Sequence, residues 1–313
     1  MREWLIEAER AGDERLLIDA IFSFTSEVWT RGIVSEDIIR RLEDSVRSAR
    51  EYGWTADEVD LRVILGWARF LLGEWAESEG HLQLAHDLVE SHGGHSQRWV
   101  IILPYALGNL AMARGRLDEA RATFERGLAR VRFHAPIWLN HGLAWCQWMM
   151  GDEAAAVASM ERSLEASSRI RCVICGCQAH GFAAEFFATL GDAGRAEPLA
   201  RQAEDTAREI GHVTTQIRVL RARARLALAA GTPERAVEVG QQAVTLGANL
   251  PLPQPYELGQ SLLMLGTAQQ AAGQADHAAA SWREARSLFE RLGAAWHLRQ
   301  VEEAIARSGA ATS

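Results

Sequence analysis

The sequence predicts an all-α protein of about seven helical pairs with a period of roughly 40 residues. The central segment Leu107–Arg132 contains two apolar stripes at helical spacing, one on each side of Gly115. Two such helices cannot bury both stripes alone, so neighbouring pairs must cover them. Glycines equivalent to Gly115 recur at intervals of 36 to 42 residues. These hinge glycines are Gly32, Gly73, Gly115, Gly151, Gly191, Gly231 and Gly273.

Small residues accompany the hinges in a constant register, which is the second observation behind this prediction. Seven residues before a hinge the chain carries Gly66, Gly108, Ala144, Ala184, Ala224 and Gly266. Shortly after a hinge it carries Ser78, Ala120, Ala156, Ala196, Ala236 and Ala278. Small side chains at both places allow the two helices of a pair to approach closely, so the pattern predicts tightly packed hairpins.

Each repeat thus has a small residue, a hinge glycine and a second small residue, and in the central repeat the aromatic Phe124 follows. This order resembles the tetratricopeptide (TPR) pattern. The resemblance implies a right-handed α-α superhelix. The period is nearer 40 residues than the usual 34 or so, which resembles the longer-helix arrays in sensor arms of large bacterial regulators. HEAT-type helical pairs have a similar period and remain an alternative fold.

We expect residues 1–313 to form a single TPR-like solenoid. Residues 1–53 read as a degenerate N-terminal pair or cap, 54–250 as core repeats, 251–257 as a proline-rich linker, and 258–308 as the last pair with a C-terminal capping helix. Residues 92–95 read as a loop between repeats. The chain resembles the C-terminal TPR arm of ATP-dependent LuxR-type regulators and multidomain nucleotide cyclases, whose ATPase, cyclase or DNA-binding domains would lie in other parts of a longer protein.

Composition excludes several classes of activity. All 33 basic residues are arginine, so no phosphate-loop, kinase or Schiff-base lysine exists here. The net charge of -8 argues against direct nucleic-acid binding. The chain shows no signal peptide and no apolar run of about 18 residues, which predicts a cytoplasmic protein without membrane contact. No motif indicates an enzyme or a cofactor.

In TPR arrays the first helix of each pair lines the concave groove, and the resemblance carries this role over by position. It predicts a groove surface that is aromatic in its first half and basic in its second. Its ligand-binding set is Trp67, Phe70, Tyr105, Asn109, Trp138, His141, Trp145, Trp148, Glu185, Arg218, Arg221 and Arg225, with Met112 and Trp29 beside them. Such a surface suits a protein or peptide partner, or a small effector with a flat apolar part and an anionic end.

Each part of this surface also has a purely structural interpretation. Tryptophans at helical spacing can be packed in the core. The three arginines place like charges three and four residues apart, which needs an acidic partner. That partner is either a ligand or a glutamate on a neighbouring helix, such as Glu185.

Three cysteines and a histidine, Cys172, Cys175, Cys177 and His180, offer thiolate and imidazole groups that suit zinc or copper(I). Their spacing matches no standard zinc module, and on one continuous helix Cys175 and Cys177 point about 200° apart. Buried free thiols are the alternative.

Three functions follow from these observations. The first is a non-catalytic binding arm of a bacterial signalling or transcription-regulatory protein, with its site in the groove. The second is a scaffold that docks partners through its edges or ends. The third is a thiol-based metal or redox sensor.

Overall fold

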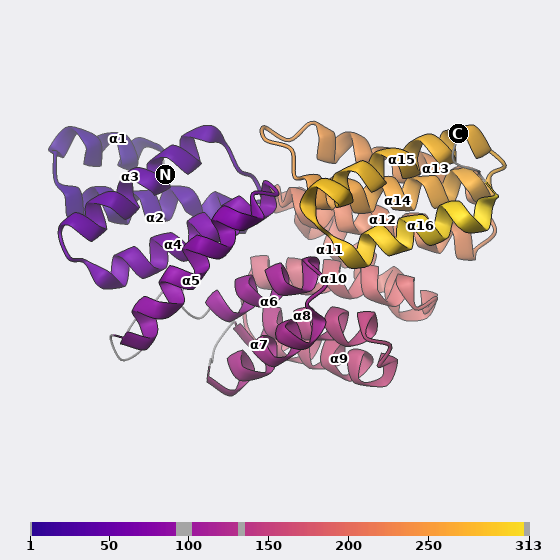
Figure 1. Ribbon diagram of the computed structural model, residues 1–313, viewed down its shortest axis with the longest axis horizontal. Helices are drawn as coiled ribbons and strands as arrows, with labels where there is room; N and C mark the ends of the chain where they lie inside the picture. The colour runs from indigo at the N-terminus through magenta and orange to yellow at the C-terminus, as the bar shows by residue number, and fades with distance from the viewer. Residues whose placement is uncertain (1, 92–101, 131–134, 310–313) are drawn as a thin grey trace.

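A computed structural model describes residues 2–91, 102–130 and 135–309 (Figure 1). The predicted loop at residues 92–95 and the end of the segment Leu107–Arg132 lie outside these ranges. The described residues form sixteen helices, which confirms the all-α prediction. The helices are α1 (Arg2–Ala11), α2 (Glu14–Thr30), α3 (Glu36–Glu51), α4 (Thr55–Leu71), α5 (Trp75–Ser91), α6 (Leu103–Ala113), α7 (Leu117–Arg130), α8 (Ala135–Met149), α9 (Glu153–Arg169), α10 (Val173–Thr189), α11 (Ala193–Ile210), α12 (Val213–Ala229), α13 (Pro233–Ala248), α14 (Pro255–Ala271), α15 (Ala275–Leu292) and α16 (Ala295–Ser308).

Every predicted hinge glycine ends the first helix of a hairpin. All seven adopt a left-handed backbone, with φ between 68° and 87°. At Gly115 the N–H donates to the Met112 carbonyl (2.9 Å), and the next N–H, of Arg116, donates to the Ala111 carbonyl (2.8 Å). Glycine adopts this conformation without the steric cost that a Cβ brings, and the two bonds satisfy carbonyls at the helix end. The seven predicted helical pairs are therefore confirmed.

Small residues bring the two helices of each hairpin into contact. A Cβ on Gly108 of α6 would overlap the ring of Phe124 on α7. In the preceding hairpin a Cβ on Gly66 would lie 2.8 Å from the side chain of Leu82. Ser78, the small residue after that hinge, donates from its hydroxyl to the Gly66 carbonyl at 2.7 Å. The register of small residues therefore creates the space that large partner side chains fill.

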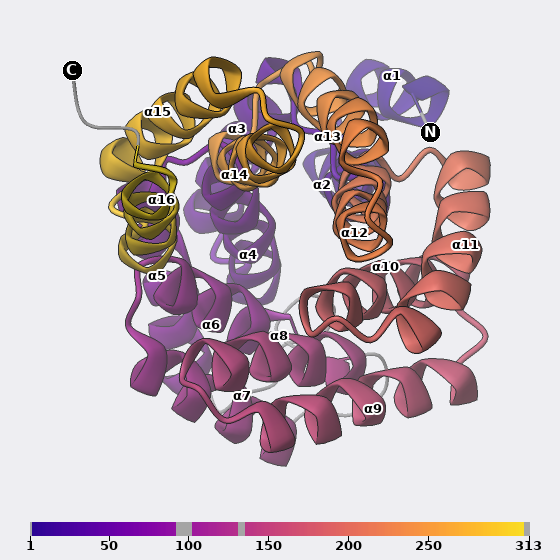
Figure 2. The same cartoon turned by 90° about the vertical axis from the view of Figure 1, so that its right-hand side faces the viewer.

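Consecutive hairpins stack side by side and wind around a common axis. In Figure 2, α7, α9, α11 and α15 lie on the outside, while α4, α6, α8, α12 and α14 lie nearer the axis. The first helices of neighbouring pairs pack against each other, as α10 does against α12 and α12 against α14. Helix α1 precedes the first hairpin and α16 follows the last. The architecture is a TPR-like solenoid.

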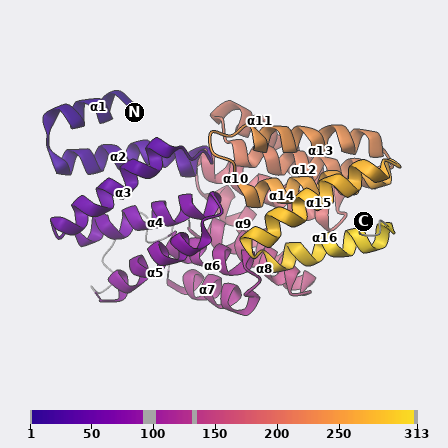
Figure 3. The same cartoon turned by 45° about the horizontal axis from the view of Figure 1, so that its top comes forward.

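The superhelix also closes on itself. Repeats in a solenoid usually contact only their neighbours, yet the tip of the first hairpin reaches the sixth and seventh. The Arg31 carbonyl accepts a hydrogen bond from the Val213 N–H (2.9 Å), and the Gly32 carbonyl accepts one from Gln254 Nε2 (2.6 Å). Figure 3 shows the end of α2 beside α10 and α12. This closure encloses the inner face of the array.

Within the part of the chain that the structure describes, every helix is too short or too polar to cross a membrane.

Candidate functional site

The inner face of the closed superhelix holds a cavity of about 100 Å³. An engineered apolar cavity of about 150 Å³ binds benzene, so this volume suits one side chain or one small ring. Residues that line it include Trp29, Trp67, Phe70, Tyr105, Asn109, Met112, Trp145, Trp148, Gln178, Phe182, His212, Thr214, Arg218, Tyr256, Glu257, Gln260, Trp296 and His297.

The two halves of the chain present different turns of their first helices to this cavity. In α4 the lining residues Trp67 and Phe70 follow the small residue Gly66 by one and four positions, and in α8 Trp145 and Trp148 follow Ala144 in the same way. In α12 and α14 the lining residues come earlier. Arg218 precedes Ala224 by six positions, and Gln260 precedes Gly266 by six. The hinge ends of the early hairpins thus face the starts of the late first helices.

Aromatic rings from distant helices meet around the cavity. The rings of Phe70 on α4 and Tyr256 on α14 have centroids 6.1 Å apart. Trp148 on α8 and Trp296 on α16 lie 5.3 Å apart. Aromatic pairs at such distances add attraction beyond the area they bury. The wall is therefore held by contacts across the superhelix, and its aromatic faces are available to an apolar group.

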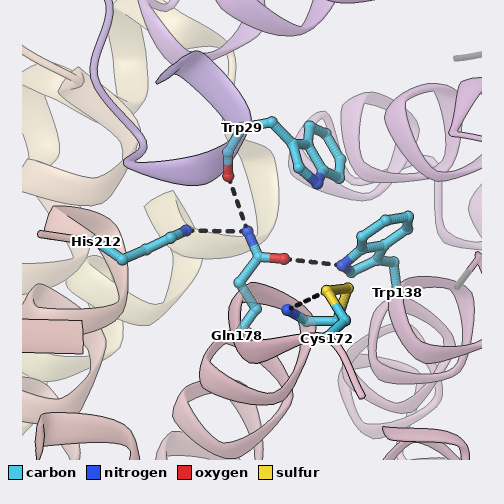
Figure 4. The surroundings of a disulfide bond; sticks show 6 residues. Trp29, Trp138, Cys172, Gln178 and His212 are labelled. Atoms are coloured by element: carbon cyan, nitrogen blue, oxygen red, sulfur yellow. Dashed lines mark hydrogen bonds between the residues drawn. A yellow bond between two sulfur atoms is a disulfide. The ribbon is translucent and has the colours of Figure 1, made fainter. Parts of the chain in front are cut away.

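Gln178 of α10 joins three helices beside this wall (Figure 4). Its Oε1 accepts a hydrogen bond from Trp138 Nε1 of α8 (2.8 Å), and its Nε2 donates to the Trp29 carbonyl at the end of α2 (3.2 Å). The same Nε2 lies 2.9 Å from Nε2 of His212. His212 in turn caps α12, because its Nδ1 accepts the N–H of Thr215 (3.2 Å). The amide of Gln178 thus fastens the first hairpin to the fifth and sixth.

Three histidines at or near the cavity are neutral at physiological pH: His141 and His212, which are buried, and His297, which is partly exposed. Burial lowers the pKa of His212 to about 4 and that of His297 to about 3. Burial, with a smaller contribution from the charge of Arg218, also lowers the pKa of His141 well below its usual value. His141 Nε2 lies 3.0 Å from the Tyr105 hydroxyl, and its ring stacks on Phe182 with centroids 3.9 Å apart. These imidazoles act as polar packing groups and carry no charge into the cavity.

A buried ion-pair cluster supports one side of the cavity. The guanidinium of Arg221 donates through Nε and Nη2 to the two carboxylate oxygens of Glu185 (2.6 and 3.0 Å) and through Nη1 to Glu257 (2.8 Å). Arg218 donates to the same two carboxylates. Arg225 lies 3.8 Å from Glu185. Burial alone would raise the pKa of Glu185, but the three guanidinium groups lower it to about 2.

This cluster identifies an acidic partner for the predicted basic stripe. Both carboxylates come from neighbouring helices, Glu185 from α10 and Glu257 from α14. Three guanidinium groups face two carboxylates, which leaves one uncompensated positive charge. Arg225 is the least paired of the three, with a single contact to Glu185 at 3.8 Å. Arg218 is the member of the cluster that lines the cavity, and its guanidinium lies 4.0 Å from the centre of the Phe182 ring. The cavity therefore favours an anionic group over a cationic one beside its apolar occupant.

The predicted ligand-binding residues separate into two groups. Seven of them line the cavity, together with Trp29 and Met112: Trp67, Phe70, Tyr105, Asn109, Trp145, Trp148 and Arg218. The other five, Trp138, His141, Glu185, Arg221 and Arg225, do not line it. Arg221 and His141 have no exposed surface, so neither can contact a ligand in this arrangement.

Several lining residues were not predicted, among them Gln178, His212, Tyr256, Trp296 and His297. His212 precedes α12, and Tyr256 lies in the first turn of α14. The constant register of groove positions points instead to the middle of each helix. Tyr256 and Trp296 could have been found from the sequence, because each is an aromatic residue at the start of a late helix.

The cysteine cluster does not assemble as a metal-ligand set. Cys172 and Cys175 form a disulfide, which removes two of the four expected ligands. Cys177 lies on the opposite side of α10, with its sulfur 4.0 Å from the Ala203 carbonyl. Across residues 2–91, 102–130 and 135–309, no three metal-ligating side chains come together. The structure therefore does not bring Cys172, Cys175, Cys177 and His180 together as one metal site.

A tetratricopeptide repeat family model matches residues 99–169. The chain contains a tetratricopeptide-repeat array. No curated protein matches the sequence.

Solved structures with the same architecture extend the likeness over most of the chain. A Rap protein complexed with competence and sporulation factor is 12% identical, with a TM-score of 0.59, over 82% of this chain and 72% of that one. Cut9–Hcn1, a hetero-tetramer of APC/C, is 14% identical, with a TM-score of 0.55, over 92% and 56%. A signal transduction ATPase with numerous domains from Pyrococcus horikoshii, which carries a tetratricopeptide repeat sensor, is 12% identical, with a TM-score of 0.54, over 88% and 43%. At such low identity the likeness establishes the fold alone.

Proposed function

We propose that this chain is a non-catalytic recognition module that binds a segment of a protein or peptide partner in its superhelical groove. One apolar side chain of that segment enters the aromatic cavity. One observation carries this proposal. The residues that line the cavity come from eight helices: α2, α4, α6, α8, α10, α12, α14 and α16. One occupant therefore contacts first helices from every hairpin at once.

The chemistry of the wall defines the preferred anchor. Tryptophan and tyrosine provide large, rigid apolar surfaces and dominate the binding energy at many interfaces. A leucine or phenylalanine side chain comes close to the cavity volume. The net positive charge of the cluster of three arginines and two glutamates, of which Arg218 lines the cavity, favours an acidic residue or a terminal carboxylate next to this anchor. The proposed ligand is thus an acidic peptide segment with one large apolar residue.

The likeness to solved structures supports a recognition role. The Rap protein was solved with competence and sporulation factor, and the archaeal ATPase carries its repeats as a sensor. This chain spans less than half of the length of that ATPase. We propose that residues 1–313 act as one sensor arm in bacterial signalling or transcription control. Flanking ATPase, cyclase or DNA-binding domains are part of the same proposal.

A displayed peptide library selected on the purified chain tests the binding proposal. Selected peptides should share one large apolar residue beside an acidic one. Their affinity, measured by fluorescence anisotropy, should fall at least about tenfold in Trp67→Ala and Trp148→Ala, because each removes an anchor surface. Tyr52→Ala is the matched control, since Tyr52 is 56% exposed outside the groove. Equal affinity for folded groove variants would favour the scaffold alternative, in which partners dock at edges or ends.

A small effector is a second candidate ligand. The cavity volume suits a small ring and a side chain equally. Such an effector would place a ring against the aromatic wall and a carboxylate near Arg218. Titration with benzoate and with uncharged benzamide, followed by tryptophan fluorescence, tests this idea. Saturable binding of benzoate that is lost in Trp148→Ala supports it, whereas equal binding of both probes contradicts the role of charge.

A further inference from the structure

The sequence Cys172-Val-Ile-Cys175 forms a disulfide at the very start of α10. Cys172 is the residue that caps the helix, and its sulfur accepts the N–H of Cys175 at 3.2 Å. Figure 4 shows the pair beside Gln178 and Trp138. Two cysteines with two residues between them at a helix N-terminus form the arrangement that favours thiol–disulfide chemistry.

The two sulfur-bearing residues differ in their access to solvent. Cys172 is half-buried and precedes Val173, which is 61% exposed. Cys175 faces the core and is only 3% exposed. Cys172 is therefore the more exposed residue of the pair, and an external thiol has better access to its side of the disulfide, while Cys175 is the sulfur that leaves as a thiolate inside the protein. This asymmetry distinguishes a reacting cysteine from a resolving one.

The other two cysteines have the opposite environment. Cys146 and Cys177 are free and buried. Burial raises the pKa of Cys146 to about 12 and that of Cys177 to about 11, so both remain protonated and unreactive at neutral pH. They provide internal controls for the reactivity of the Cys172–Cys175 pair.

We propose that Cys172 and Cys175 form a redox-active dithiol–disulfide site that exchanges with external thiols, and that Cys172 is the residue attacked. The partial positive charge of the α10 N-terminus stabilises a thiolate on Cys172 and makes it a good nucleophile in the reduced state. The substrate class is a low-molecular-weight thiol or a protein dithiol.

The exchange balances in two steps. A thiolate of a dithiol reductant attacks the sulfur of Cys172, the bond between Cys172 and Cys175 breaks, and Cys175 leaves as a thiolate that takes up a proton. The second thiolate of the reductant then attacks its own sulfur in the mixed disulfide and releases Cys172. The reductant ends as a disulfide, and the protein ends with two thiols. The reverse sequence restores the bond from an external disulfide.

The site adjoins the contacts that close the superhelix. Gln178, which binds Trp138 and the Trp29 carbonyl, lies three residues after Cys175 on the same helix. Reduction removes the covalent link between Cys172 and the first turn of α10, which loosens the turn that precedes Gln178. Reduced protein should therefore bind groove peptides more weakly. This consequence rests on the proposed function, whereas the exchange itself does not.

Differential alkylation followed by mass spectrometry tests the exchange without any groove ligand. The folded chain is incubated with dithiothreitol, alkylated with excess iodoacetamide while it is still folded, and then digested. We expect alkylation of Cys172 and Cys175 after minutes of reduction, while Cys146 and Cys177 stay unmodified. In a parallel reduced sample, glutathione disulfide added before the alkylation should restore the disulfide and so protect Cys172 and Cys175. A pair that is reduced only when the chain is globally unfolded by urea, or that is found as free thiols after oxidation, would overturn the proposal.

Single variants locate the reacting sulfur. In Cys175→Ser, Cys172 should form a mixed disulfide with glutathione disulfide at least about ten times faster than Cys175 does in Cys172→Ser. Circular dichroism verifies that both variants remain folded, as does the absence of modification at Cys146 and Cys177. Equal rates in the two folded variants would contradict the assignment of Cys172 as the attacked residue.

Discussion

Arg221 of α12 forms a two-point hydrogen bond with Glu185 of α10, through Nε at 2.6 Å and Nη2 at 3.0 Å, in an interior hidden from solvent. Its remaining terminal nitrogen reaches Glu257 of α14. One guanidinium thus connects three consecutive hairpins. A charge in this position depends on its partners, because the loss of one member leaves the remaining buried charges with fewer partners.

Arg221→Met should lower the free energy of unfolding by about 3–5 kcal/mol, because the buried carboxylates of Glu185 and Glu257 lose the guanidinium that bonds both of them and keep only Arg218 and the more distant Arg225. Urea unfolding followed by circular dichroism measures the change. Arg223→Met is the matched control on the same helix, since Arg223 pairs with Glu204 at the surface and should cost at most about 1 kcal/mol. Equal losses in both variants would show that the buried cluster has no special role.

The stability of the fold should depend on pH through His212. Its pKa is about 4 in the folded chain and about 6.5 when unfolded, so between these values only the unfolded chain binds the proton. The free energy of unfolding should fall as pH drops from about 6.5 to about 4. Below about pH 4, His212 should cause no further decrease. His212→Asn keeps a capping acceptor without a titrating ring. Its stability should fall less over this range, and parallel profiles for both proteins would contradict the assignment.

Gly108→Ala should destabilise the third hairpin by about 1–3 kcal/mol, since the added methyl group overlaps the Phe124 ring. Gly80→Ala, within α5, tests a helical glycine that has room for a methyl group. Apart from the backbone of α5 itself, no atom of the described residues lies within 4 Å of a Cβ at Gly80, so alanine should stabilise the chain by up to about 1 kcal/mol through its helix propensity. Thermal unfolding of both variants measures the pair. A stabilised Gly108→Ala would contradict the packing described here.

Gln178→Leu should cost about 1–3 kcal/mol, because Trp138 Nε1 and the Trp29 carbonyl each lose a partner in a buried place. The same substitution at Gln241, which is exposed on α13, should change the free energy of unfolding by less than about 0.5 kcal/mol. Hydrogen exchange should also show faster opening at the end of α2 in Gln178→Leu. Unchanged exchange there would mean that Gln178 does not fasten the first hairpin.

The repeating part of this fold was predictable from sequence because its causes are local. A hinge glycine ends a helix through its own backbone, and a small residue seven positions earlier makes room for a partner such as Phe124. These requirements recur in each hairpin, so each copy supports the others. The same register also predicted the half of the cavity wall formed by Trp67, Trp145 and Trp148.

The other half of the wall depends on how the superhelix closes, which no single repeat encodes. Bonds such as those from Val213 and Gln254 to the first hairpin join residues that are far apart in sequence. They turn the start of α12 and α14 toward the cavity and leave Arg221 and Arg225 in the ion-pair cluster. The disulfide at Cys172 was missed because its short spacing was interpreted as a set of metal ligands.

A crystal structure of the chain with a selected acidic peptide tests the central proposal most directly. The account predicts one large apolar side chain of the peptide between Trp67, Trp148 and Tyr256, with a carboxylate near Arg218. A peptide bound to the outer helices, with the aromatic cavity unchanged, would contradict it.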